Sequence, residues 1–279
     1  YKALSPFTNE KTPSFYVVPS KGIFKDFSSG KGGDSITFLM EVDGLSYVEA
    51  LKFLAQRYGI EVVEEEQTDE QQEAQNKRES LFILLGFAKD RFVDLLWNHE
   101  EGKSIGLSYF KERGFTDESV KEFELGYTID SWDDLLKQAE KKGYKKELLE
   151  EAGLVISKEG GKVYDRFRNR VIFPIHNISG KVVAFGARTL SKDKKQPKYI
   201  NSPETELYNK SRVLYGLYQA KQEVRKEDNI YLVEGYTDVI SMHQTGVKNV
   251  VSSSGTALTE DQIKLIRRYT ENVTVIFDG

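Results

Sequence analysis

Residues 230–251 read IYLVEGYTDVISMHQTGVKNVV, and this segment decides the fold of the carboxyl-terminal part of the chain. Apolar runs alternate there and beyond with helical patterns: runs at 230–233, 247–251 and 273–277, helices at 236–244 and 260–269. Strands separated by single short helices are joined by right-handed crossovers into a parallel sheet. The sequence therefore predicts an α/β subdomain over residues 229–279.

Acidic residues follow the strands of this predicted sheet. Glu234 comes directly after the first apolar run, Asp278 follows the last, and Asp238 lies about one helical turn after Glu234. Ligands collect at the carboxyl ends of the strands in open parallel sheets. Three carboxylates without Cys or His suit Mg²⁺ (or Mn²⁺) rather than zinc. The alternative is that these acids only cap strands and a helix.

A basic segment precedes the predicted sheet. The chain carries a net charge of -4, yet residues 158–226 contain 16 Lys and Arg against 6 Asp and Glu. Aromatic residues lie among these cations, and cations with rings are what phosphates and stacked bases require. Arg166, Arg168 and Arg170 alternate in a strand-like stretch, which predicts three side chains on one face that track a nucleic acid. A solvated basic surface is the alternative.

The remainder of the chain divides by composition. Residues 1–63 open with short β segments and continue with two helices, at 35–42 and 47–58. Residues 64–79 are acidic and polar, typical of a linker or an exposed helix. Residues 80–228 start with helices, one of them at 104–113, and become β-rich after Gly153. Apolar runs at 170–175 and 181–185 flank a turn and predict a hairpin, and His176 after the first run is interpreted as structural. The predicted fold class is thus α+β joined to α/β, with domains at 1–63, 80–228 and 229–279 around a linker at 64–79.

Composition excludes several classes of protein. At 279 residues with 39% hydrophobic residues the chain is long enough to bury cores, which argues against wholesale disorder. It has no cysteine, so disulfide and thiol chemistry are excluded, and its three histidines are scattered. No apolar run reaches membrane-spanning length, which predicts no membrane partner and a cytoplasmic protein. The first residue is Tyr1 and the last are Asp278 and Gly279, which we interpret as the ends of a fragment.

Several strings in the chain resemble one family. YLVEGYTDVI (231–240), VVSSSGTALT (250–259) and VTVIFDG (273–279) resemble the opening of a Toprim domain. Further upstream, four strings resemble the polymerase core of the bacterial replicative primases of the DnaG type: DRFRNRVIFPI (165–175), GKVVAFGAR (180–188), PKYINSPET (197–205) and KSRVLYGL (210–217). SPFTNEKTPSF (5–15) and GIFKDFSSGKGG (22–33) resemble the zinc ribbon of that family.

The ribbon departs from the family pattern at its metal ligands. Ser5, Thr8, Asp26 and Ser29 occupy the positions of the four zinc ligands. Neutral hydroxyls do not replace thiolates on Zn²⁺, so we expect no zinc. We expect apolar residues to hold this ribbon instead: Phe7, Phe15, Ile23, Phe24 and Phe27. Its lysines would meet template phosphate or belong to the ordinary surface: Lys11, Lys21, Lys25 and Lys31.

The resemblance also implies roles for individual residues. Glu234 and Asp278 match the catalytic, metal-binding acids of the family, and Asp238 matches a further acid of the first motif. Lys210 and Arg212 alternate as in a strand and resemble residues near the phosphates of the incoming nucleotide. Other residues would line the same cleft: Arg188, Lys198, Tyr199 and Asn201.

The resemblance implies a primase that makes short RNA primers on single-stranded DNA at the bacterial replication fork. Its substrates would be ribonucleoside triphosphates, with Mg²⁺ or Mn²⁺ as cofactor. Its helicase partner would bind through a domain that this chain does not contain. Two alternatives stay open: a single-stranded DNA-binding module with non-catalytic acids, and another Toprim enzyme that cleaves DNA.

Overall fold

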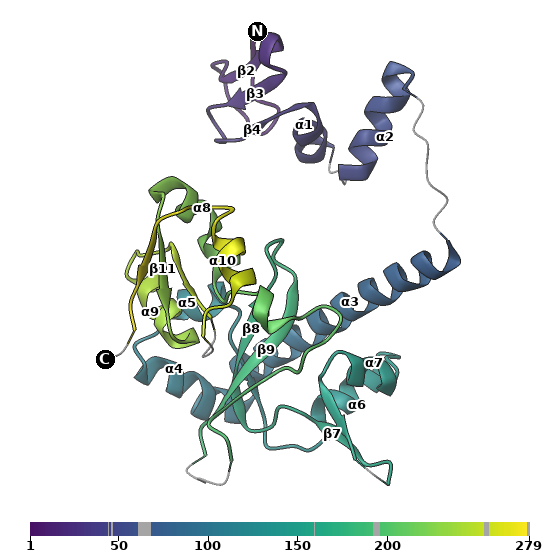
Figure 1. Cartoon of the computed structure of the whole chain (residues 1–279), viewed down its shortest axis with the longest axis vertical. Helices are drawn as coiled ribbons and strands as arrows, with labels where there is room; N and C mark the ends of the chain where they lie inside the picture. The colour runs from purple at the N-terminus through teal and green to yellow at the C-terminus, as the bar shows by residue number, and fades with distance from the viewer. Residues whose placement is uncertain are drawn as a thin grey trace. The chain divides into compact units, whose positions relative to one another are not determined.

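The computed structural model describes residues 1–43, 45, 47–60, 68–158, 160–191, 196–253 and 257–277. The chain divides into two compact units, Tyr1–Thr68 and Asp69–Gly279 (Figure 1). The division falls inside the predicted linker at 64–79, and the predicted boundary between residues 228 and 229 stays a prediction. In the part of the chain that is described, no helix is both long and apolar enough to cross a membrane.

The first unit is a small antiparallel sheet followed by two helices. The sheet has the order β1-β2-β3-β4. Its elements are β1 (Lys2–Ala3), β2 (Phe15–Val18), the 3₁₀ turn η1 (Pro19–Lys21), β3 (Ile23–Asp26), β4 (Gly32–Gly33), α1 (Ser35–Val42) and α2 (Tyr47–Tyr58). The two helices have the predicted bounds.

The apolar cluster of the ribbon differs in part from the predicted one. Phe7, Phe15 and Phe24 pack together with ring centroids 5.5–6.3 Å apart, as the sequence suggested. Phe38 of α1 completes the cluster, 5.4 Å from Phe24. The expectation for Ile23 and Phe27 is wrong, because 42% and 68% of these residues is exposed. Ile23 alternates with Phe24 along β3, so the two side chains leave opposite faces.

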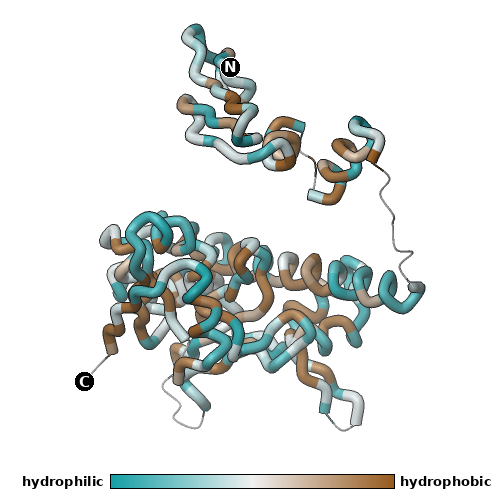
Figure 2. Tube along the Cα trace, turned by 45° about the horizontal axis from the view of Figure 1, so that its top comes forward, coloured by the Kyte–Doolittle hydropathy of each residue, from teal (hydrophilic) through white to brown (hydrophobic). Residues whose placement is uncertain are grey.

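The second unit starts with the long helix α3 (Asp69–Asn98). Of the two interpretations left open for the acidic stretch, the helix is correct from Asp69 onward. The buried side chains of α3 begin only at Leu81, and Figure 2 shows the change from a hydrophilic start to a more hydrophobic continuation. The acidic first turns of α3 are therefore exposed to solvent, whereas its later turns pack against the central sheet of the second unit.

The central sheet of the second unit is antiparallel, in the order β10-β9-β8-β5. The predicted hairpin over 170–185 forms, with β9 extended to Thr189. The strands are β5 (Gly126–Thr128), β8 (Arg170–His176), β9 (Val182–Thr189) and β10 (Tyr199–Asn201). Around them lie η2 (Gly102–Leu107), α4 (Ser108–Glu112), α5 (Asp117–Glu122), α6 (Asp134–Lys141), α7 (Lys146–Glu151) and the hairpin β6 (Val155–Ser157) with β7 (Val163–Asp165).

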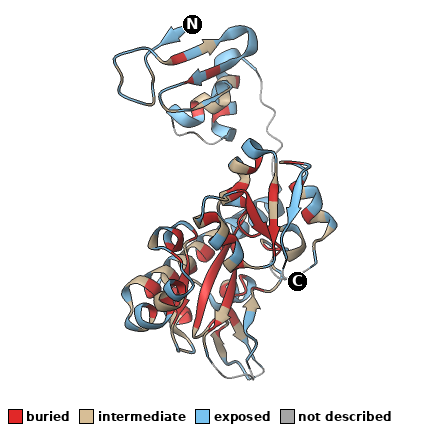
Figure 3. Cartoon of the chain, turned by 90° about the vertical axis from the view of Figure 1, so that its left-hand side faces the viewer, coloured by how far each residue is buried: buried red, intermediate tan, exposed pale blue. Residues whose placement is uncertain are grey.

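Both faces of the central sheet are buried. Ile172 and Phe185 pack against α3 residues such as Phe92 on one face. Phe173 and Ala184 belong to the cluster on the other face. Successive side chains of a strand point to opposite faces, so one sheet serves two cores. Figure 3 shows these strands buried along most of their length.

The parallel sheet forms as predicted, in the order β12-β11-β13. Two of its strands are shorter than expected: residues 247–249 lie outside β12, and residues 276–277 lie outside β13. The elements are the 3₁₀ turn η3 (Lys210–Arg212), α8 (Leu217–Glu227), β11 (Ile230–Val233), α9 (Tyr236–Gln244), β12 (Val250–Ser252), α10 (Glu260–Ile266) and β13 (Val273–Val275). The carboxyl ends of its strands meet at one edge, which is where the acids of the first motif lie.

Glu124 connects three elements of the second unit. Its carboxylate accepts from Lys89 Nζ of α3 at 2.7 Å and lies 2.8 Å from His176 Nε2 at the end of β8. These hydrogen bonds, that of His176 first, lower the pKa of Glu124 to about 2. His176 therefore has a structural role, as its sequence context suggested.

We predict that Glu124→Gln lowers Tm near pH 6 by roughly 2–4 °C, about 1 kcal/mol after allowance for solvent screening. A carboxyl with a lowered folded pKa stabilises the fold above its unfolded pKa and loses that effect as pH falls. The difference between variant and wild type will shrink between about pH 4.5 and 2 in thermal melts. Glu147→Gln, at an exposed site on α7, is the control. A pH-independent difference would contradict the assignment.

Candidate functional site

An acidic edge lies at the carboxyl end of β11. Glu234 follows the last strand residue and is exposed, and Asp238 is exposed in the first turn of α9. Asp238 Oδ2 accepts a hydrogen bond of 2.9 Å from the Gly235 amide, next to Glu234. Ser252 Oγ donates to the Glu234 carbonyl at 2.7 Å and ties the ends of β11 and β12 together. The two predicted acids are therefore brought to one edge.

The third predicted acid, Asp278, lies outside the described residues. Among the residues that are described, no group of three metal-ligating side chains is close enough to hold an ion. Glu234 and Asp238 offer hard carboxylate oxygens to solvent, with no imidazole between them. This donor set fits Mg²⁺ or Mn²⁺ and not zinc.

A basic cavity of about 570 Å³ lies between η2, α4 and the end of β9. Its lining is mostly polar: Ser104, Ile105, Ser108, Tyr109, Glu112, Arg113, Arg188, Thr189, Leu190, Ser191 and Lys198. The guanidinium of Arg188 lies 4.6 Å from the centre of the Tyr109 ring, and that of Arg113 lies 5.6 Å from it. Two arginines thus converge on one aromatic ring, and Lys198 lines the same cavity.

Two buried polar atoms of this cavity have no hydrogen-bond partner within the described chain. They are Tyr109 Oη and Arg188 Nε. Burial raises the pKa of the Tyr109 phenol, so its hydroxyl keeps its proton at neutral pH. Buried donors without partners are costly unless something accepts from them. A phosphate oxygen in the basic cavity would be such an acceptor.

Tyr236 joins the acidic edge to the face of the central sheet that carries Arg188. It starts α9 two residues after Glu234, and its ring stacks on Phe173 with centroids 5.2 Å apart. Tyr236 Oη donates to Asn201 Oδ1 at 2.9 Å. Gly186 is the strand partner of Asn201, and a side chain at its position would run into the same ring.

The strand register then relates the two parts of the site. Arg188 follows Gly186 by two residues on β9, so both face the same side, about 6.7 Å apart along the strand. Tyr199 is opposite Arg188 on β10. The predicted cleft residues Arg188, Tyr199 and Asn201 are therefore brought together, and Lys198 lines the cavity beside them.

The prediction that one strand presents Arg166, Arg168 and Arg170 is wrong. Arg166 and Arg168 lie in the connection between β7 and β8, and only Arg170 belongs to a strand. Asn169 between them has φ +51°, which breaks the extended backbone.

Each of these arginines has a different environment. Arg170 is buried and donates to the Pro197 carbonyl at 3.1 Å, so it supports the backbone beside Lys198. The Arg168 guanidinium lies 3.6 Å from the centre of the exposed Trp132 ring and pairs with Asp130. Burial lowers the pKa of Arg166, whose Nε has no partner within the described chain.

The predicted strand alternation of Lys210 and Arg212 is also incorrect. Both belong to the 3₁₀ turn η3, which packs against the start of α10 through a hydrogen bond from Gln262 Nε2 to the Lys210 carbonyl. Arg212 Nε donates to Asp261 at 2.9 Å. Their side chains are therefore not presented by one face of a strand.

Sequence reasoning missed Tyr109 and Arg113. Both lie in the predicted helix over 104–113, at the i, i+4 spacing that puts side chains on one helix face. The charge pattern directed attention to residues 158–226 instead. The sequence signal that could have identified them is a basic residue one helical turn after an aromatic residue.

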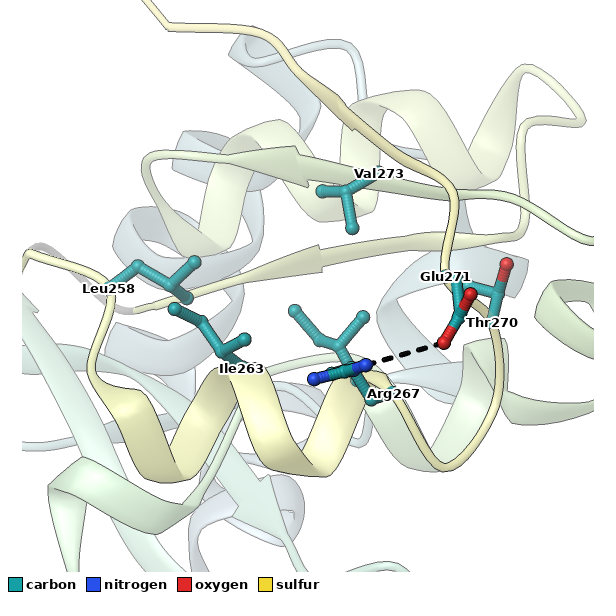
Figure 4. Close-up of a pocket in the computed structure, with 7 residues that line it drawn as sticks. Leu258, Ile263, Arg267, Thr270, Glu271 and Val273 are labelled. Carbon is teal, nitrogen blue, oxygen red and sulfur yellow. Dashed lines mark hydrogen bonds and ion pairs between the residues drawn. The ribbon is translucent and has the colours of Figure 1, made fainter.

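A second cavity, of about 330 Å³, lies between α10 and β13. Figure 4 shows apolar side chains around it, with Arg267 directed toward Glu271. These two residues form an ion pair of 3.4 Å. Because its arginine is paired and its other lining is mainly apolar, this cavity is less suited to a phosphate than the basic cavity.

Comparisons with known proteins agree with this architecture. Three family models match: CHC2 zinc finger at residues 1–70, the amino-terminal domain of the DNA primase catalytic core at 92–221, and Toprim-like at 231–279. DNA primase of Halalkalibacterium halodurans is 44% identical over all of this chain, which covers 46% of that protein. The chain thus spans about half the length of such curated relatives.

Solved structures are similar as well. The zinc-binding and RNA polymerase domains of Aquifex aeolicus primase match all of this chain and 66% of that one, with 36% identity and a TM-score of 0.67. A DnaG primase catalytic domain bound to single-stranded DNA matches 73% of this chain and 62% of that one, with 37% identity and a TM-score of 0.66.

The chain thus combines the amino-terminal domain of a primase catalytic core with a Toprim-like sheet. The three family models follow one another along the chain in the order of a primase. The chain belongs to the DnaG-type bacterial DNA primases.

We predict that Gly186→Ala destabilises the second unit by about 1–3 kcal/mol, as overpacking does. An alanine Cβ would lie 2.4 Å from Tyr236 Cε2, so the ring has to move. Tyr236→Phe removes only the hydrogen bond and will cost about 1 kcal/mol. Denaturant unfolding measures both. Gly86→Ala, on α3 with open space around its Cβ position, is the control. Unchanged stability of Gly186→Ala would refute the close contact.

Proposed function

We propose that the protein is a DNA-dependent RNA polymerase that joins ribonucleotides into short primers on single-stranded DNA. The observation that carries this proposal is the packing contact between the Tyr236 ring and Gly186. Tyr236 lies two residues after Glu234, and it packs on the face of the central sheet that carries Arg188, which supports a common site for the acids and the cations. Nucleotide joining requires both, because an attacking hydroxyl and a triphosphate meet there.

The acidic edge would serve the reacting oxygens. Glu234 and Asp238, with Asp278 following Phe277 in the sequence, are the proposed ligands of Mg²⁺ or Mn²⁺. When bound, such an ion screens phosphate charge and favours the ionised 3′-oxygen of the primer. The Asp238 carboxylate is held in place by the Gly235 amide, so it needs little reorganisation to receive a cation.

The basic cavity would hold phosphates of the template or the nucleotide. Arg188 and Lys198 supply charge, and Tyr109 Oη and Arg188 Nε supply donors that lack partners within the described residues. Tyr199 is 42% exposed beside Arg188, so a base can stack on its ring. The relative with bound single-stranded DNA supports this assignment.

Further contacts extend from this centre. Lys210 and Arg212 would approach the phosphates of the incoming nucleotide from η3. Arg212 would then exchange its hydrogen bond to Asp261 for one to a phosphate oxygen. Arg168 stacked on Trp132 offers a second basic and aromatic surface along the path of the strand. The lysines of the ribbon would contribute to template selection. The protein would act in replication in the bacterial cytoplasm. Its helicase partner would bind through a domain that this chain does not contain.

We predict that Glu234→Gln lowers primer synthesis by at least about 100-fold, because a neutral amide holds Mg²⁺ poorly. The assay follows RNA formed by the full-length protein from ribonucleotides, Mg²⁺ and single-stranded DNA. Affinity for the DNA will stay within about 2-fold, since few template contacts depend on this carboxylate.

Glu271→Gln is the matched control, because Glu271 is an exposed acid that precedes β13, away from the carboxyl edge. It will retain wild-type synthesis. If neither wild type nor Glu234→Gln makes RNA while both bind DNA equally, the protein is a binding module. DNA cleavage in place of synthesis would identify another Toprim activity.

We predict that Arg188→Ala weakens binding of single-stranded DNA by roughly 5- to 10-fold at low salt. The slope of log affinity against log salt will fall by about 0.7, the value for one lost phosphate contact on a single strand. Arg267→Ala removes an arginine paired with Glu271 at the second cavity and is the control. Fluorescence anisotropy at several salt concentrations measures both. Equal losses in the two variants would show diffuse attraction rather than a site.

A further inference from the structure

The four residues at the zinc-ligand positions of the ribbon are close together in space. Ser5 Oγ donates to Asp26 Oδ2 at 2.9 Å, and Ser29 Oγ donates to the same oxygen. Thr8 Oγ1 lies 2.6 Å from Ser28 Oγ, which itself donates to Asp26 Oδ2 at 2.9 Å. The positions that carry a metal in the family therefore surround a carboxylate here.

Asp26 is the centre of this arrangement. The residue is fully buried at the end of β3. Beyond the three hydroxyls, the Ser29 amide donates to Oδ2 at 3.0 Å and Ser14 Oγ lies 3.1 Å from Oδ1. Burial alone would raise the pKa of Asp26, but the donors of Ser29, Ser28 and Ser5 hold it far below its usual range. The carboxylate is thus a buried anion whose Oδ2 accepts four hydrogen bonds.

Glu10 forms the second half of the network. Its Oε1 accepts from the amides of Ser5 at 2.8 Å and Ser14 at 2.9 Å. Its Oε2 accepts from Ser14 Oγ at 2.6 Å. Ser14 lies between the two acids, so Glu10 and Asp26 join the loop after β1, the start of β2 and the turn after β3. These are the loops that a ribbon metal cross-links.

Zinc does not fit this set of residues. Structural zinc takes four thiolate or imidazole ligands, and here one carboxylate stands with three neutral hydroxyls. The hydroxyl protons are directed at Asp26 or its neighbours, so the donor atoms already serve hydrogen bonds. The chain has no cysteine, and its three histidines all lie in the second unit.

We infer that the hydrogen-bond network centred on Asp26 and Glu10 takes the structural place of zinc in this ribbon. The loops are joined by a buried carboxylate and its hydroxyl donors, together with the packed ring cluster of Phe7, Phe15, Phe24 and Phe38. The ribbon then folds without metal, and Asp26 is the residue on which its cross-link depends. This inference is independent of the proposed activity.

The test uses hydrogen exchange and metal analysis on the whole chain, expressed in medium that contains zinc. We expect no stoichiometric zinc and unchanged amide exchange of β2 and β3 after treatment with a strong chelator. Asp26→Asn replaces one acceptor oxygen by an amide donor that faces hydroxyl donors. It will speed exchange in β2 and β3 by about 10-fold or more, and exchange in β8 and β9 will stay unchanged.

Asp43→Asn is the matched control, because Asp43 is an exposed acid of the same unit. It will exchange as wild type. A converse variant combines Ser5→Cys, Thr8→His, Asp26→Cys and Ser29→Cys, and we expect its ribbon to bind one zinc and become sensitive to the chelator.

Three results would overturn the inference. One is stoichiometric zinc in the wild-type ribbon, with faster exchange after chelation. Another is wild-type exchange in Asp26→Asn, which would show that the carboxylate does not hold the loops. The third is a four-substituted chain that stays folded without zinc and ignores the chelator, because the four positions would then not be the cross-link.

Discussion

The arrangement of the second unit depends on the contact between the Tyr236 ring and the backbone at Gly186. The central antiparallel sheet and the parallel sheet have separate backbone hydrogen-bond ladders, so side-chain packing and side-chain hydrogen bonds such as that of Tyr236 with Asn201 orient one against the other. Tyr236 lies two residues after Glu234, and Gly186 lies two residues before Arg188. A shift of one residue in the β8–β9 register would send Arg188 to the face that α3 covers. The placement of acids against cations thus depends on a position without a side chain.

Much of this arrangement could be predicted from the sequence. The alternating runs after residue 229 specify a parallel sheet because strand and helix periods differ, and the acids after Val233 follow from the edge to which strands lead. The buried hairpin of β8 and β9 was evident from its apolar runs and the turn between them. The extension of β9 to Thr189 and the presence of β10 beside it were harder to predict, since short polar edge strands carry little periodic signal.

The failures have a common physical origin. Arg166, Arg168 and Arg170 alternate in the sequence, but Asn169 adopts a positive φ that no alternation pattern reveals. Arg170 looked like a surface cation and is buried against carbonyls of residues 197 and 198. Lys210 and Arg212 lie in a 3₁₀ turn because tertiary contacts with Gln262 fix the backbone there. Local pattern thus identified the residue types and misjudged how the backbone presents them.

Carboxylates of this chain differ in role because they differ in burial and in donors. Asp26 is buried with hydroxyl donors, and Asp165 is buried with the amides of Leu135 and Leu136 at the start of α6. Burial raises the pKa of Asp165 to about 7, whereas the denser set of donors lowers that of Asp26. Glu234 and Asp238 are exposed at a strand edge instead. An acid enclosed by donors joins elements of the fold, whereas a cation from solvent reaches an exposed acid at a sheet edge.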